Sequence, residues 1–133
     1  MADRICVDTD VLVGFLRNDK QIVEWFSSIE KTSVLATTQI NAFELYFGAF
    51  HSVKREKNLE STERLLQRLI LLNMSQDSAR HAGECLHRMK TAGNEIEMRD
   101  IIIGCITLVN GFRLKTTNKK HFGRIPGLVI EDD

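Results

Sequence analysis

The chain lacks an excess of charge of either sign. Its 133 residues include 18 basic and 18 acidic side chains, so the formal net charge is zero. This balance does not indicate a nucleic-acid-binding protein, although a local basic rim matters more than the total charge. No apolar run is long enough to span a membrane. Acidic residues interrupt the first ten positions, so no secretory signal peptide is expected.

Cysteine is scarce and has no metal-binding spacing. Cys6, Cys85 and Cys105 each lie in an apolar segment, and none belongs to a C-x-x-C pair. Such cysteines are typical of reduced, buried thiols, and their spacing argues against a zinc site. We therefore expect a cytoplasmic protein without disulfide bonds.

Repeats, low-complexity tracts and flexible linkers are absent too, so residues 1–133 are expected to form one domain. Short apolar segments predict strands at 4–7, 34–36, 112–116 and 128–130. Helical spacing of apolar residues predicts helices at 10–16, 22–29, 39–51, 62–70, 78–89 and 98–110. The polar stretch 54–58 fits a loop or a helix end, and 70–72 fits a helix end or a strand.

Alternating strands and helices predict an α/β fold with a parallel sheet and helices on both of its faces. Ligands bind beyond the carboxyl ends of the strands in such sheets. Asp8 and the pair Thr117-Asn118 both follow predicted strands. We therefore expect them at the same edge of the sheet.

Three carboxylates occur in unusually apolar surroundings. Asp8 ends an apolar run, Glu44 lies among apolar and aromatic residues, and Asp100 precedes the apolar segment 101–103. An ionised acid in such surroundings is costly unless it is paired or binds a metal. Carboxylates with open coordination positions suit Mg²⁺ or Mn²⁺. Three such acids therefore predict a shared divalent cation and a metal-dependent active site.

Each acid also has a structural explanation. Asp8 and Asp100 are placed to cap helices, although Asp10 looks the better cap for the first helix. Glu44 could face solvent, but its helical neighbours are mostly apolar. The pair Asp8 and Asp10 also fits the D-x-D motif of haloacid-dehalogenase-type phosphatases, as nucleophile and general acid. No Ser-His-Asp order, G-x-S-x-G motif or phosphate-binding glycine loop is present as an alternative.

Four segments, in chain order, resemble the motifs D-T-x-x-L-[IV], E-L-x-x-G-A, D-x-x-I-A-A and T-x-[ND]-x-x-[HD]-F. They are Asp8-Thr9-Asp10-Val11-Leu12-Val13, Glu44-Leu45-Tyr46-Phe47-Gly48-Ala49, Asp100-Ile101-Ile102-Ile103-Gly104-Cys105 and Thr116-Thr117-Asn118-Lys119-Lys120-His121-Phe122. In these segments the chain resembles the PIN-domain nucleases, specifically the VapC-type toxins of toxin–antitoxin pairs.

The resemblance implies a PIN-like three-layer α/β/α sandwich with a central parallel sheet. It implies a homodimer, a cognate antitoxin partner and RNA cleavage that depends on Mg²⁺ or Mn²⁺. Asp8, Glu44 and Asp100 correspond to metal-binding catalytic acids, and Asn118 to a fourth catalytic position. Asn118 offers a carbonyl oxygen without adding charge, so the number of metal ions stays open.

Residues around the acids have more than one interpretation. Thr9 and Thr117 are expected to hydrogen-bond the acids or to act as turn hydroxyls. Arg99 could contact a substrate phosphate or reduce the repulsion between the acids. The basic cluster in 54–68 fits a solvated face, a phosphate contact or an antitoxin site.

Three aromatic residues, Trp25, Phe47 and Phe50, are expected in the core or at a dimer contact rather than stacked on bases. A non-enzymatic PIN-like scaffold that binds RNA or a partner without cutting is the remaining alternative.

Overall fold

The centre of the molecule is a four-stranded parallel sheet. A computed structural model describes residues 2–132. The strands are β1 (Asp3–Val7), β2 (Ser33–Thr38), β3 (Ile70–Leu72) and β4 (Arg113–Lys115), in the spatial order β3-β2-β1-β4. β1 pairs with both neighbours, and Cys6 lies opposite Ala36 of β2 and Leu114 of β4. β1 is therefore a central strand with its last residues fully buried.

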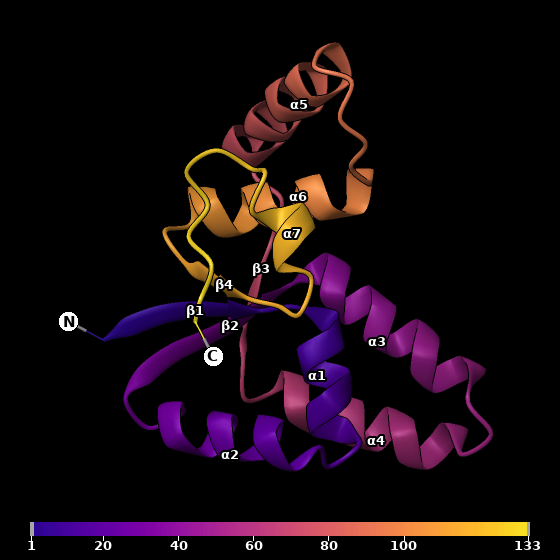
Figure 1. The fold of residues 1–133 in the computed structure, drawn as a ribbon. Helices are drawn as coiled ribbons and strands as arrows, with labels where there is room; N and C mark the ends of the chain where they lie inside the picture. The colour runs from indigo at the N-terminus through magenta and orange to yellow at the C-terminus, as the bar shows by residue number, and fades with distance from the viewer. Residues whose placement is uncertain (1, 133) are drawn as a thin grey trace.

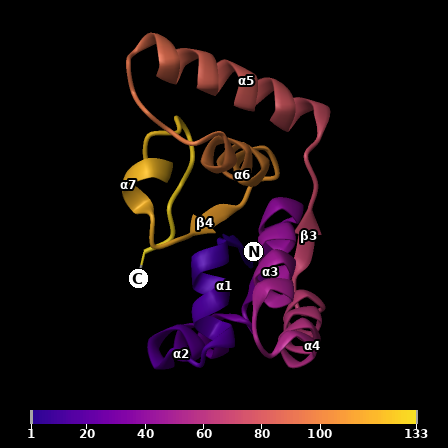
Figure 2. The ribbon, with the colours of Figure 1, turned by 90° about the vertical axis from the view of Figure 1, so that its right-hand side faces the viewer.

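In the described part of the chain, residues 2–132, seven helices cover the two faces of the sheet, in agreement with the expected α/β/α sandwich (Figure 1). They are α1 (Thr9–Leu16), α2 (Lys20–Ile29), α3 (Gln39–His51), α4 (Arg55–Leu66), α5 (Gln76–Thr91), α6 (Met98–Val109) and α7 (Lys119–Phe122). Helices α1 to α4 lie on one face and α5 to α7 on the other, as the turned view shows (Figure 2). None of the helices within residues 2–132 combines the length and apolar character that a membrane crossing requires.

The alternation of side chains along β1 divides the core into two parts. Ile5 and Val7 pack with Phe26 of α2 and Leu45 of α3, whereas Cys6 packs with residues of α5 and α6 such as Ile103. Strands that are apolar on both faces are what a parallel sheet covered by two helical layers requires.

Most predicted elements are confirmed, and the open cases are resolved. The helix at 39–51 is α3, and Thr38 caps it through a capping box with Asn41. Segment 54–58 lies largely in α4, and 70–72 is the strand β3. Helix α5 begins at Gln76, two residues before the predicted start, because Ser75 accepts a hydrogen bond from the backbone N–H of Ser78.

The predicted strand at 128–130 is wrong. This segment forms only an isolated bridge between Ile130 and Leu114. The backbone N–H of Leu114 donates to Val129, and that of Glu131 donates to Leu114. Pairing at a single residue of β4 does not make a ladder, so an apolar sequence alone gave the wrong prediction here.

The sheet topology has a switch point at the carboxyl ends of β1 and β4. From β1 the chain continues through α1 and α2 on one face, whereas β4 is reached through α5 and α6 on the other. Adjacent strands with connections on opposite faces form the kind of switch point at which ligands bind in α/β proteins. The backbone N–H of Asp8 donates to Lys115, so the two strand ends remain joined at this edge.

Candidate active site

Asp8 lies at the end of β1 and is almost completely buried, with 2% of its surface exposed. Its Oδ1 accepts hydrogen bonds from the backbone N–H of Thr9 and from Asn41 Nδ2, both at 2.9 Å. Its Oδ2 accepts from Thr116 Oγ1 at 2.8 Å. Asp8 is also the N-cap of α1, which corrects the preference for Asp10. Its carboxylate therefore caps a helix and faces the site at the same time.

Glu44 reaches the same place from the middle of α3 and is not turned away into solvent. Thr9 Oγ1 donates to Glu44 Oε1 at 2.6 Å, as expected for a hydroxyl that supports an acid. Asn41 lies one helical turn earlier, and its Nδ2 donates to Thr9 Oγ1 at 2.8 Å. Glu44, Thr9 and Asn41 thus form one hydrogen-bonded chain that ends on Asp8.

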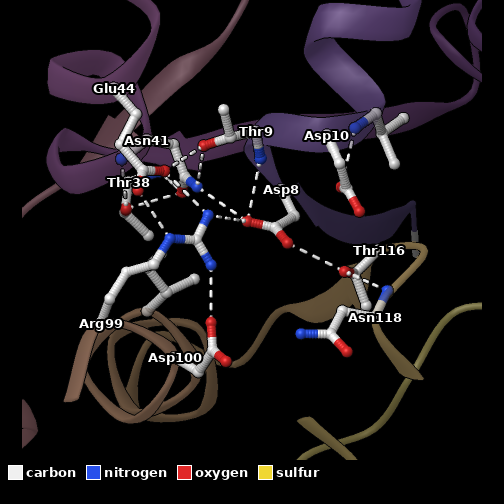
Figure 3. Close-up of polar contacts among 12 residues, drawn as sticks. Asp8, Thr9, Asp10, Thr38, Asn41, Glu44, Arg99, Asp100, Thr116 and Asn118 are labelled. Atoms are coloured by element: carbon white, nitrogen blue, oxygen red, sulfur yellow. Dashed lines mark hydrogen bonds and ion pairs between the residues drawn. The ribbon is translucent and has the colours of Figure 1, made fainter. Parts of the chain in front are cut away.

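Asp100 lies in the first turn of α6 and is also 2% exposed. The adjacent Arg99 brings the three acids together (Figure 3). Its Nη1 donates to Asp100 Oδ1 at 2.6 Å, and its Nη2 donates to Asp8 Oδ1 at 3.1 Å. Its Nε and Nη2 donate to the two oxygens of Glu44 at 2.6 and 2.8 Å. A single guanidinium therefore contacts all three acids.

The pKa shifts follow from this arrangement. Burial raises the pKa of Asp8, and this outweighs the opposite effect of the charge on Arg99. Burial acts to raise the pKa of Glu44 as well, but hydrogen bonds from Arg99 and Thr9 outweigh it and lower the pKa. Hydrogen bonding to Glu44, above all, raises the pKa of Arg99, so its positive charge is permanent at ordinary pH.

Asn118 and Thr117 lie after β4 but do not join the acids directly. Asn118 Nδ2 lies 3.1 Å from His121 Nδ1, and that nitrogen lies 3.8 Å from Asp100 Oδ2. Thr117 binds Asp10 through both its backbone N–H and its hydroxyl. The acid that Thr117 supports is thus Asp10, whereas Arg99 binds the other three acids.

Sequence reasoning missed three residues that contact the acids: Asn41, Thr116 and His121. Asn41 carried a detectable signal, because it precedes Glu44 by three positions and so shares its helix face. Thr116 follows β4 directly, and its hydroxyl binds Asp8. His121 is part of the last motif but had been treated as an isolated histidine.

The donor set fits a hard divalent cation. All three acids offer carboxylate oxygens, which Mg²⁺ and Mn²⁺ prefer, and all three already converge on one positive group. Within residues 2–132, no three Asp, Glu, His or Cys side chains stand in an arrangement that could hold a metal ion directly. The guanidinium of Arg99 is the cation around which the acids are placed.

Comparison with known proteins agrees with this geometry. The family model described as PIN domain matches residues 5–128. The chain belongs to the PIN-domain family. It is 27% identical to the tRNA(fMet)-specific endonuclease VapC of Salmonella typhimurium, over 97% of each chain. It is 30% identical to ribonuclease VapC10 of Mycobacterium tuberculosis, over 89% of this chain and 85% of the relative.

A solved structure of similar fold is the DNA-bound VapBC of Salmonella typhimurium. Its matching chain superposes with a TM-score of 0.88 and is 28% identical, and the match covers 99% of this chain and 98% of the other. The resemblance to VapC-type proteins is therefore confirmed, and the chain is a nuclease of this PIN-domain group. The haloacid-dehalogenase alternative has no support, since the family model and the relatives are of the PIN-domain group and the Asp10 carboxylate is bound by Thr117.

Proposed function

We propose that this protein is an endoribonuclease that depends on Mg²⁺ or Mn²⁺ and acts as the toxin of a toxin–antitoxin pair. The observation that carries the proposal is the convergence of Asp8, Glu44 and Asp100 on one cationic group at the carboxyl ends of β1 and β4. A bound metal ion would supply an activated water and stabilise the leaving oxygen of a phosphodiester. The names of the relatives support RNA as the substrate class.

The residues of the site take distinct roles in this proposal. Asp8, Glu44 and Asp100 hold the metal, and Asn118 offers a neutral oxygen at the fourth position. Supporting groups fix the orientation of the ligands in metal sites. Here Thr9 and Asn41 orient the carboxylates from one side, and Thr116 does so from the other.

The antitoxin partner is proposed from the neighbouring groove and from the complexes of the relatives. A groove between α1, α3 and α4 has an apolar floor that includes Phe15, Leu45 and Leu65. Basic residues of the predicted cluster line it: Lys54, Lys57, Arg64 and Arg68. An antitoxin segment with apolar and acidic side chains would match both features. We place the pair in the cytoplasm, where RNA is available and the three free cysteines stay reduced.

A homodimer is proposed from an exposed aromatic face of α3. Phe43, Phe47 and Phe50 are 68%, 63% and 54% exposed, so of the two positions expected for Phe47 and Phe50 the core is excluded and the dimer contact stays a prediction. Trp25, in contrast, packs edge-on against the buried Phe26. Spacings of four and three residues place the phenylalanines on one side of α3. Exposed apolar patches of this kind mark association sites, and a second copy of the chain would cover this one.

The test is RNA cleavage by the variant Asp100→Asn, which keeps the shape of the side chain but removes its charge. The proposal predicts cleavage by the wild type in Mn²⁺ and none in EDTA. The cleavage activity of the variant should be more than about 100-fold lower than that of the wild type. In metal sites, loss of only a supporting group already lowers metal affinity or activity by about 10- to 100-fold. Asp77→Asn is the matched control, since Asp77 also lies in the first turn of a helix, α5, and is exposed.

Two outcomes would contradict the proposal. Undiminished cleavage by Asp100→Asn would separate the activity from the acids. A wild-type protein that binds RNA but does not cut it in Mn²⁺ would favour the non-enzymatic scaffold.

A further inference from the structure

The guanidinium of Arg99 contacts four of the six carboxylate oxygens of the three acids: one oxygen each of Asp8 and Asp100 and both oxygens of Glu44. We propose that Arg99 is an internal counterion that competes with the divalent cation, so that metal binds only when Arg99 withdraws from the acids. The inference rests on the proposed metal-dependent function and adds a form of regulation within the chain itself. It makes Arg99 a positioning residue for the metal-free site.

All three nitrogens of the Arg99 guanidinium donate hydrogen bonds to the acids. Four hydrogen bonds of 2.6–3.1 Å join it to Asp8, Glu44 and Asp100. Its side chain is only 29% exposed. One positive charge faces three carboxylates, so a net negative charge remains at the centre. A divalent cation would neutralise more of this charge than the guanidinium does.

A metal ion placed among these four oxygens would compete with the guanidinium of Arg99 for the same space. Mg²⁺ requires ligand oxygens at about 2.0–2.1 Å around a single point. The guanidinium instead holds the carboxylates around its planar fork, with a different nitrogen nearest to each acid. Binding of a metal ion therefore requires an exchange of one cation for another.

The surroundings allow this exchange without loss of the fold. Asp8 keeps its bonds from Asn41 and Thr116 when Arg99 leaves, so its carboxylate stays in place. Arg99 also borders an open pocket lined by Thr9, Asp10, Phe43, Glu44 and Phe47. The guanidinium can move into this pocket, where it remains close enough to meet a substrate phosphate.

The test is the affinity for Mn²⁺, measured by calorimetric titration of the metal-free protein without RNA. If Arg99 is bound to the acids in about nine of ten wild-type molecules, the apparent affinity for Mn²⁺ is reduced about tenfold. Arg99→Gln should therefore bind Mn²⁺ about tenfold more tightly. In EDTA its melting temperature should be lower than that of the wild type. Its melting temperature should also rise more on addition of Mn²⁺, because a ligand that binds the folded state stabilises it.

Arg113→Gln is the matched control, because it removes the same charge from the chain. Arg113 pairs with Glu131 and Asp3, and Asp3 begins β1 at the end of the strand away from Asp8. Its Mn²⁺ affinity should equal that of the wild type. Arg99→Lys keeps the charge without the planar fork, so it should bind Mn²⁺ with intermediate affinity. This variant provides the test if Arg99→Gln does not fold.

The outcomes separate this inference from the proposed function. Mn²⁺ binding by the wild type with equal or weaker binding by Arg99→Gln and Arg99→Lys would overturn the role of Arg99 alone. Absence of Mn²⁺ binding in the wild type and in both variants would overturn the metal site as well.

Discussion

At the scale of single residues, the buried acids depend on neutral hydrogen-bond donors as much as on Arg99. Asn41 is fully buried and has all its polar atoms engaged. Its amide nitrogen donates to Asp8 and Thr9, and its carbonyl oxygen accepts from the backbone and hydroxyl of Thr38. One side chain thus links the cap of α3 to the acids.

Removing this link should destabilise the protein. Asn41→Ala leaves the buried Thr38 N–H and Asp8 with fewer partners, so the free energy of unfolding should fall by about 1–3 kcal/mol. Urea unfolding measures the loss. Asn73→Ala, at an exposed position, should stay within about 0.5 kcal/mol of the wild type. Equal effects of both substitutions would show that Asn41 does not hold the site.

The residue scale also shows what the sequence could reveal about the site. Asp8, Glu44 and Asp100 stood out because charge is costly beside apolar residues, and they do meet. The contact of the Thr116 hydroxyl with Asp8 was not predicted, whereas Thr117 binds Asp10. Only the exact path of the chain after β4 decides which hydroxyl meets which acid. The metal-binding and catalytic roles of the acids and of Asn118 stay predictions.

At the scale of elements, local patterns were sufficient where an element had its own signal. The Thr38 cap and apolar spacing located α3, and the apolar run located α6. Segments 70–72 and 128–130 are both short and apolar, yet only the first pairs as a strand. Periodicity cannot distinguish these cases, because the available partner strand decides them.

One contact between elements makes a prediction about pH. Arg68, two residues after the end of α4, forms two hydrogen bonds with Glu30, the C-cap of α2. The hydrogen bond from Arg68, above all, lowers the pKa of Glu30. A lowered pKa stabilises the fold above the ordinary pKa of a glutamate, and this stabilisation disappears as the pH falls through the lowered pKa.

Glu30→Gln should therefore reduce stability at pH 7 by less than about 1 kcal/mol, since the pair is partly exposed. The difference from the wild type should shrink as the pH falls below the usual carboxyl range. Urea unfolding at several pH values measures it. A difference that is constant with pH would assign the effect to packing instead of charge.

At the scale of the whole molecule, the fold places the acidic site next to the exposed aromatic face of α3. Phe43 and Phe47 border the same pocket as Glu44 and Arg99. A second copy that covered the aromatic face would therefore lie next to the acids. The zero net charge gives no indication of this local arrangement, because it averages over the entire surface.

The homodimer makes a prediction at this scale. Phe47→Glu places a charge in the proposed contact and should weaken self-association by at least about tenfold, or about 1.4 kcal/mol. Sedimentation equilibrium over a range of protein concentrations measures this change. Met74→Glu adds the same charge at another exposed apolar position and should leave self-association unchanged. A monomeric wild type, or identical association of all three proteins, would contradict the assignment.

The most direct test of the metal-dependent site is a crystal structure with Mn²⁺, in which anomalous scattering locates the ion. Asp8, Glu44 and Asp100 already converge on one cation, so we expect a Mn²⁺ peak bound by these acids. We also expect that the guanidinium of Arg99 has moved away from them. A Mn²⁺ ion bound elsewhere, with Arg99 still between the acids at a Mn²⁺ concentration that supports cleavage, would contradict the metal-dependent site.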